Sequence, residues 1–272
     1  MVTTTLPVRR DVIEGRTPCR SLRYVLRAYG DGNIFGEPYG QGPVRIVWLH
    51  GWARRGQDFA AAASELARRG VASVALDLPG FGASTAPAVA GGARRYAELV
   101  MPALKEIGDG PFVLVGHSFG GTVACVIAAN NPEVVRSLVL TGAPLLRSPS
   151  SRSSPMVYRA LRWLHARRLV RDARLEAARQ KYGSRDYRDA TGVMRDVLVA
   201  SVNESYEEEL ARLEVPVTLL WGEEDHEVPL DVATRASGLL STTHTLQSLH
   251  GIGHLLPSEA PDALANVVGA LV

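Results

Sequence analysis

Residues 112–121, Phe-Val-Leu-Val-Gly-His-Ser-Phe-Gly-Gly, are the stretch around which the chain is organised. The first four are apolar and predict a short buried strand, and the alanine- and valine-rich run from Gly121 to Asn130 predicts a helix directly after it. Between them, Gly116-x-Ser118-x-Gly120 fits a nucleophile elbow, a sharp strand-to-helix turn that holds a serine clear of its own backbone. Glycine at both flanking positions removes the Cβ atoms that would collide in so crowded a turn. The same pattern also occurs by chance, so its interpretation depends on the rest of the chain.

Length and charge limit the classes of protein to consider. At 272 residues, 46% of them hydrophobic, the chain suits one large domain or one domain with an insertion. The net charge is +2 and no block of five like charges occurs, so we expect no nucleic-acid partner. Basic residues do gather between Arg147 and Arg188, but acidic and apolar residues interleave them, which is typical of a solvated helix face.

The chain shows no pattern typical of a cofactor or a metal ion. Cys19 and Cys125 lie in unrelated contexts, and no two histidines and a carboxylate fall at metal-ligand spacing. No glycine-rich dinucleotide motif follows a strand. The N-terminus lacks the apolar core of a secretory signal, and no run of about 18 apolar residues occurs. We therefore expect a cytoplasmic protein without cofactor, metal or membrane span, either a monomer or a homodimer.

Apolar runs alternate with helical patterns along most of the chain. We expect strands at 20–29, 44–49, 71–76, 112–115, 137–140, 215–221 and 243–249, and helices at 57–69, 93–107, 121–130 and 258–271. The first strand, followed by a Gly-Asp-Gly turn, predicts an edge strand in an antiparallel hairpin. The alternation predicts an α/β protein with a parallel sheet and helices on both faces, where ligands bind at the carboxyl ends of the strands.

Residues 146–212 break this alternation. A Ser/Pro/Arg-rich linker at 148–154 precedes amphipathic segments at 156–169, 171–181 and 191–202, with no obvious strand. Because the segment begins directly after a strand's carboxyl end, we interpret it as a helical lid over that edge of the sheet. The alternative is a peripheral helical bundle that does not touch the site. The core domain would then comprise residues 1–145 and 213–272.

A serine nucleophile needs a base to take its proton and an acid to orient that base. On this architecture the expected chain order is serine, acid, histidine. Residues 221–229, Trp-Gly-Glu-Glu-Asp-His-Glu-Val-Pro, follow a strand and offer Glu223, Glu224 and Asp225 as the acid. Residues 251–257, Gly-Ile-Gly-His-Leu-Leu-Pro, place His254 in a glycine-flanked loop, with His250 as its competitor.

Five stretches together resemble the α/β-hydrolase fold superfamily and occur in its order. They are His50-Gly51-Trp52, Asp77-x-Pro79-Gly80-x-Gly82-x-Ser84, Gly116-His117-Ser118-Phe119-Gly120-Gly121, Trp221-Gly222-x-x-Asp225 and Gly253-His254. The resemblance spans residues 44 to 257. It implies a mostly parallel, twisted sheet of about eight strands with helices on both faces and a helical cap.

The resemblance also implies roles for individual residues. Ser118 would be the nucleophile, His254 the base and Asp225 the acid, because Asp225 occupies the family's position before the Val-Pro turn. The backbone N–H groups of Trp52 and Phe119 would form the oxyanion hole. The dehalogenases and epoxide hydrolases of this fold use an aspartate as the nucleophile at the elbow. Because this chain has Ser118 at that position, it does not resemble either class. His117 stands where the carbon–carbon bond hydrolases usually carry asparagine.

The expected activity is hydrolysis of an ester, thioester, lactone or amide through an acyl-enzyme. An eliminase, cyclase or acyltransferase with the same triad is the alternative, and a slow-turnover ligand receptor is a third. Met156, Trp163 and Met194 of the predicted lid suggest a medium-sized, largely apolar small-molecule substrate, although apolar residues at helical spacing more often pack a lid against its core. Arg54 and Arg55, where relatives carry small or polar residues, either hold a substrate carboxylate or are solvated.

Overall fold

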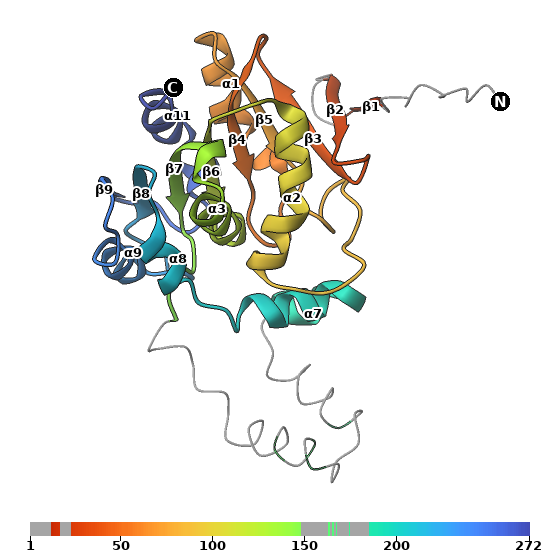
Figure 1. The fold of residues 1–272 in the computed structure, drawn as a ribbon, viewed down its shortest axis with the longest axis vertical. Coiled ribbons are helices and arrows are strands. Elements are labelled where there is room, and N and C mark those ends of the chain that lie inside the picture. The colour runs from red at the N-terminus through yellow and green to blue at the C-terminus, as the bar shows by residue number, and fades with distance from the viewer. Residues whose placement is uncertain are drawn as a thin grey trace, which may run out of the picture.

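The computed structural model describes residues 12–16, 23–147 and 185–272, with residues 163, 165, 167 and 174 between them. A nine-stranded sheet runs through the molecule in the order β1-β2-β3-β5-β4-β6-β7-β8-β9 (Figure 1). The strands are β1 (Val12–Arg16), β2 (Arg23–Tyr29), β3 (Ile34–Tyr39), β4 (Val44–Leu49), β5 (Ala72–Leu76), β6 (Phe112–His117), β7 (Val135–Thr141), β8 (Val217–Gly222) and β9 (His244–Leu249). From β5 to β9 all neighbours are parallel, which confirms the predicted mostly parallel α/β sheet.

The N-terminal edge of the sheet differs from the sequence prediction. The strand expected at 20–29 is not the edge, because β1 pairs antiparallel with β2 outside it. Its hairpin partner is β3, which pairs antiparallel with both β2 and β5. The sequence of β3 contains Gly36 and Pro38, two residue types that are depleted in strands. Gly36 is needed there, since a Cβ would lie 2.8 Å from the side chains of Leu76 and Val74.

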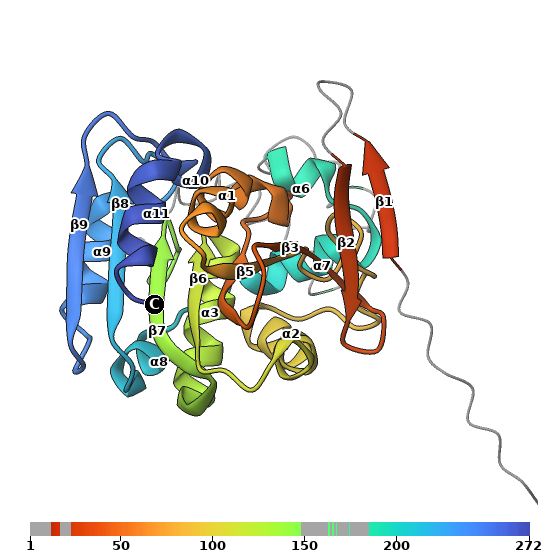
Figure 2. The same ribbon diagram turned by 90° about the horizontal axis from the view of Figure 1, so that it is seen from above.

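Helices cover both faces of the sheet (Figure 2). The helices described are η1 (Gly56–Phe59), α1 (Ala60–Arg68), α2 (Ala93–Ile107), α3 (Phe119–Asn130), η2 (Pro132–Val134), α6 (Arg185–Asp189), α7 (Gly192–Ser201), α8 (Glu207–Arg212), α9 (Leu230–Ser237), α10 (Leu256–Glu259) and α11 (Pro261–Gly269). Alternate residues of β4 point to opposite faces: Trp48 packs with α1 and α11, whereas Val47 and Leu49 pack with α2 and α3. The parallel strands are therefore buried on both sides, as their apolar sequences predict.

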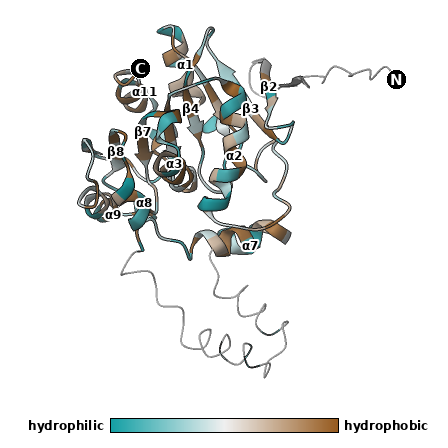
Figure 3. Ribbon diagram, viewed as in Figure 1, coloured by the Kyte–Doolittle hydropathy of each residue, from teal (hydrophilic) through white to brown (hydrophobic). Residues whose placement is uncertain are grey.

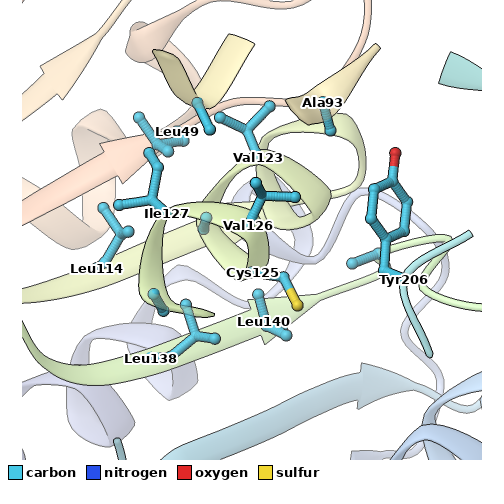
Figure 4. Close-up of a cluster of buried hydrophobic side chains, with 14 of the residues drawn as sticks. Leu49, Ala93, Leu114, Val123, Cys125, Val126, Ile127, Leu138, Leu140 and Tyr206 are labelled. Atoms are coloured by element: carbon cyan, nitrogen blue, oxygen red, sulfur yellow. The ribbon is translucent and has the colours of Figure 1, made fainter. Parts of the chain in front are cut away.

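Helix α3 is the central helix of the larger core. Residues 119–128 are all buried, and the helix is apolar on every side (Figure 3). Figure 4 shows Val123, Val126 and Ile127 among leucines of β4, β6 and β7. Because α3 follows Ser118 directly, this packing fixes the helix end that carries the elbow.

Of the predicted insertion, residues 146–212, the structure describes 146–147, 185–212 and four single residues between them. Helix α7 coincides with the helix expected at 191–202, whereas the helices expected at 156–169 and 171–181 lie outside the described residues except at 163, 165, 167 and 174. Val197, Tyr206 and Leu210 belong to the same buried cluster as α3, so this end is anchored in the core. The division into core and lid stays a prediction. No helix within the described ranges is long and apolar enough to cross a membrane.

Candidate active site

Ser118 stands on a strained turn between β6 and α3. Its backbone angles are φ 50° and ψ −119°, a combination that non-glycine residues rarely adopt. A Cβ at Gly116 would lie 2.5 Å from the carbonyl oxygen of Gly120, and a Cβ at Gly120 would collide with the carbonyl oxygens of Leu49 and His50. Both glycines of the motif are therefore required by the close approach of α3 to β4 and β6.

Three side chains distant in sequence meet at the carboxyl ends of the strands. Ser118 Oγ lies 3.2 Å from His254 Nε2, and His254 Nδ1 lies 2.8 Å from Asp225 Oδ2. The other oxygen of this buried carboxylate accepts the N–H groups of Glu227 (2.9 Å) and Val228 (2.8 Å). Because a carboxylate only accepts, Nδ1 carries the proton, and Nε2 is left to accept from the serine.

The surroundings of His254 change its pKa in opposite directions. Burial lowers the pKa, while the hydrogen bond to Asp225 and the charges of Asp225, Glu227 and Glu259 raise it, with a net rise above the ordinary value. The ring of His117 lies beside it, with centroids 4.9 Å apart. Burial, then the charge of His254, lowers the pKa of His117 to about 3, so this neighbour is neutral.

The structure separates the candidate acids and histidines. Glu223 is exposed and bonds to Ser248 Oγ at 2.7 Å and to His250 Nδ1 at 3.2 Å. The side chain of His250 is 91% exposed. Glu224 is exposed as well. Of the alternatives weighed from the sequence, Asp225 and His254 are the pair that meets Ser118.

His50 ties two loops at the site together. The side chain is fully buried, with Nδ1 2.7 Å from the carbonyl oxygen of Gly51, while Nε2 accepts the N–H of Leu78 at 2.9 Å. These partners require the tautomer with the proton on Nδ1. Burial lowers the pKa of His50, which keeps it in that neutral form. His50 thus holds the loop that carries Trp52 against the loop that follows β5.

Asp77 fixes the same loops from the other side. Its Oδ1 accepts the N–H of Gly56 at 2.8 Å, and its Oδ2 accepts the N–H of Ala83 at 2.9 Å. Its carbonyl oxygen accepts the hydroxyl of Ser84 at 2.6 Å, and that hydroxyl oxygen accepts the N–H of Phe35. The Asp-x-Pro-Gly-x-Gly-x-Ser motif is therefore a hydrogen-bonded brace for the site.

A row of aromatic rings joins the two residues expected to form the oxyanion hole. The rings of Trp52 and Phe119 meet edge to face with centroids 5.7 Å apart. Phe81 packs on Trp52 at 5.0 Å, and Tyr96 packs on Phe119 at 4.9 Å. The hydroxyl of Tyr96 donates to the carbonyl of Pro79 at 2.8 Å. These contacts hold the two backbone segments on either side of Ser118.

A pocket of about 940 Å³ opens onto Ser118. It is lined by Trp52, Ser118, Phe119, Thr122, Pro144, Leu146, Arg147, Asp186, residues 201–204, Tyr206, residues 226–229 and Val232. Sequence reasoning missed most of this lining, including Glu227. Its position two residues after Asp225 is the one signal in the sequence that could have indicated it.

The predicted substrate contacts do not line this pocket. Arg54 and Arg55 line a separate pocket of about 480 Å³ with Asp77, and Arg54 forms an ion pair with Asp58. The physical reason is the left-handed turn at Ala53 (φ 53°), after which the chain leaves the site.

The two described apolar residues predicted for the lid also lie elsewhere. Met194 packs beside Gly80, with its sulfur 3.8 Å from the hydroxyl of Tyr96. Trp163 is exposed under the guanidinium of Arg167. Met156 lies outside the described residues. Among the residues that the structure describes, no cluster of three or more His, Cys, Asp or Glu side chains could hold a metal ion.

Comparisons with known proteins agree with this architecture. The model of the alpha/beta hydrolase family matches residues 46–267. The pimeloyl-[acyl-carrier protein] methyl ester esterase of Chromobacterium violaceum is 39% identical over 134 residues, 49% of this chain and 46% of that protein, so the match spans about half of that relative. The uncharacterized hydrolase YugF of Bacillus subtilis is 29% identical over 88% of this chain and 94% of its own length.

Two solved structures show the same fold. An esterase from Exiguobacterium antarcticum superposes with a TM-score of 0.70 at 19% identity, covering 90% of this chain and 97% of that one. The thioesterase domain from the curacin biosynthetic pathway gives a TM-score of 0.65 at 20% identity, covering 95% and 99%. The two share the sheet and its helices with this chain.

Proposed function

Since this chain belongs to the alpha/beta hydrolase family, we propose that it is a serine hydrolase acting on an ester-type bond of a small molecule. The substrate class is a carboxylic ester, thioester or lactone, cleaved through an acyl-enzyme on Ser118. The observation that carries the proposal is the hydrogen-bonded series from Ser118 through His254 to Asp225 at the mouth of a pocket. The relative named as a methyl ester esterase supports an ester as the bond cleaved.

The first step is attack by Ser118 on the carbonyl carbon. His254 Nε2, 3.2 Å from Oγ, takes the hydroxyl proton as the Oγ–C bond forms. The imidazole becomes an imidazolium, which the carboxylate of Asp225 stabilises at Nδ1 without taking its proton.

The carbonyl oxygen becomes an oxyanion in this step. The N–H groups of Trp52 and Phe119 are proposed to donate to it, and each such donor contributes about 3 kcal/mol of transition-state stabilisation. The hydrogen bonds that close the flanking turns use other amides: Arg54 donates to Gly51, and Gly121 and Thr122 donate to Ser118. The aromatic contacts between Trp52 and Phe119 support both backbones in one geometry.

The imidazolium then gives its proton to the leaving oxygen of an ester or the leaving sulfur of a thioester, and the C–O or C–S bond breaks to release the alcohol or thiol. In the second half a water molecule gives its proton to Nε2 and attacks the acyl carbon. The proton returns to Ser118 Oγ as the acid leaves. In one catalytic cycle the imidazole of His254 therefore acts twice as a base and twice as an acid.

We also propose that residues 146–212 form a helical lid on this pocket. Asp186 and residues 201–204 come from the described end of the segment and line the pocket beside Ser118. A cover from this segment would exclude water while the acyl-enzyme forms.

A fluorophosphonate probe with intact-mass readout tests the proposal. The wild type should gain one adduct, and Ser118→Ala should gain none and lose about 10⁴-fold or more in kcat/KM on p-nitrophenyl butanoate. Ser248→Ala is the matched control, since Ser248 is exposed and its hydroxyl faces Glu223. Label from ¹⁸O-water should enter the acid product. Turnover without that label would indicate the non-hydrolytic alternatives, and no adduct on Ser118 would contradict the proposal.

A further inference from the structure

Glu227 places a second carboxylate at the active histidine. Its Oε2 lies 3.6 Å from His254 Nε2, the nitrogen that faces Ser118. Its backbone N–H donates to Asp225 Oδ1 at 2.9 Å, so the triad's acid also fixes the main chain of Glu227. The side chain is 72% exposed and lines the pocket that opens onto Ser118.

The position of Glu227 coincides with the leaving-group side of the site. His254 Nε2 must deliver its proton to the departing oxygen, so that oxygen has to come within hydrogen-bond reach of Nε2. Substituents on the departing alcohol then extend from a point beside the Glu227 carboxylate. The acyl group lies on the other side of the reacting carbon.

We propose that Glu227 determines specificity for the charge of the leaving group. It favours esters whose alcohol carries a positive charge and disfavours those whose alcohol carries a negative one. The inference deepens the proposed function and rests on it.

The other charged groups that face His254 are already engaged. Asp225 uses both oxygens within the triad and its loop. Glu259, on α10, accepts the N–H groups of Gly253 (2.6 Å) and Leu255 (3.3 Å). His117, on β6, is neutral because burial lowers its pKa to about 3. The carboxylate of Glu227 is thus the charge at Nε2 that an incoming substituent meets.

Two of the other charged groups that line the pocket have partners of their own, Glu204 and Arg147. Glu204 accepts the N–H of Ala93 at 2.8 Å and the hydroxyl of Tyr206 at 2.9 Å, which directs its carboxylate toward the start of α2. Arg147 donates to the carbonyl of Asn203, which lines the same pocket. Asp186 is exposed and adds a further negative charge to the same pocket.

The experiment uses three butanoate esters of nearly equal shape. Their alcohols are 2-(trimethylammonio)ethanol, 3,3-dimethylbutanol and 2-sulfoethanol, which are cationic, neutral and anionic. Wild type, Glu227→Gln and Glu224→Gln are compared by kcat/KM on the alkaline plateau of each variant's own pH profile, where His254 is neutral. Intrinsic ester reactivity cancels when the same ratio is compared between variants.

In Glu227→Gln the cationic-to-neutral ratio should fall about three- to tenfold, and the anionic-to-neutral ratio should rise by a similar factor. Half a molar NaCl should lower the cationic-to-neutral ratio and raise the anionic-to-neutral ratio of the wild type, since the carboxylate is exposed and salt screens it. Glu224→Gln, an exposed acid in the same turn, should keep the wild-type ratios. A uniform change in all three esters would overturn the inference, because it would indicate an effect through His254 alone. Failure of the probe to label Ser118 would instead overturn the proposed function.

Discussion

His254 lies between two carboxylates with different tasks. Asp225 is buried and holds Nδ1, whereas Glu227 is exposed and faces Nε2. The interaction of the buried Asp225 with His254 is strong because solvent does not screen it. The interaction of the exposed Glu227 with His254 is weaker and depends on salt. One imidazole can therefore be oriented by one neighbour and biased toward certain substrates by the other.

The raised pKa of His254 predicts the pH dependence of the reaction. A protonated imidazole cannot accept the serine proton, so kcat/KM should fall as pH falls through the pKa of the free enzyme. Burial lowers this pKa but the bond to Asp225 and the nearby carboxylates raise it further, so the midpoint should lie above 6.5. The measurement is kcat/KM for a neutral ester from pH 5 to 9.

His250, the other histidine considered as the base, provides the control for this pH profile. His250→Gln should keep the wild-type midpoint, because its imidazole bonds to Glu223 and is 91% exposed. Glu227→Gln should move the midpoint down, since one of the charges that raise the pKa is removed. A flat profile, or a midpoint below 6.5, would contradict the role given to His254.

The sequence indicated which acid and histidine meet Ser118 better than it indicated the lining of the pocket. Ser118, Asp225 and His254 follow motifs whose spacing reflects strand ends, and the sheet brings strand ends together. Arg54 and Arg55 are next to such a motif, but a single left-handed residue, Ala53, directs them to another pocket. Proximity along the chain does not determine which side of a turn a side chain lies on.

At the scale of elements, the sequence predicted the parallel strands and their helices more accurately than the antiparallel strands near the N-terminus. Helix α2 begins and ends at the predicted residues because glycines flank an amphipathic run. Strand β3 was not predicted with bounds, since its Gly36 and Pro38 are unfavourable in isolation and are accommodated only by packing on β5. Tertiary context overrides local propensity there.

An ion pair between Arg94 and Glu209 joins α2 to α8. Arg94 Nε donates to Glu209 Oε1 at 2.7 Å and Nη2 donates to Oε2 at 3.0 Å. The carboxylate side chain is 4% exposed, and that of the arginine is 44% exposed. Because the acid is buried and the base is not, loss of the arginine leaves an uncompensated charge inside the protein.

Arg94→Met should therefore lower the free energy of unfolding by about 1–3 kcal/mol, a range reduced because Arg94 is partly solvated. The double variant Arg94→Met/Glu209→Gln should be more stable than Arg94→Met, since it removes the buried charge as well. Urea unfolding monitored by circular dichroism measures the stability of both variants and of Glu209→Gln alone. A double variant as unstable as the sum of the two single ones would refute this explanation.

At the scale of the whole molecule, the described end of residues 146–212 is part of the core. The larger buried cluster contains Tyr29 near one edge of the sheet, most of α3, and Val197, Tyr206 and Leu210. Helix α8 packs against α3, the helix that directly follows Ser118. The described end of this segment therefore packs with the core, and the domain boundary expected at 213 stays a prediction.

This continuity predicts that α8 and α3 unfold as one unit. In native-state hydrogen exchange, the amide of Leu210, bonded to the carbonyl of Tyr206 at 2.9 Å, should exchange with the same free energy as that of Ile127 in α3. Leu210→Ala should lower both values equally, by about 2–4 kcal/mol, because Leu210 is fully buried in the shared cluster. If α8 belonged to a separable lid, its amides would instead exchange at a lower free energy that urea changes little, and Leu210→Ala would leave Ile127 unaffected. Equal values would mean that any movement of the lid takes place N-terminal to α8, with the pocket floor at Tyr206 held in place during turnover.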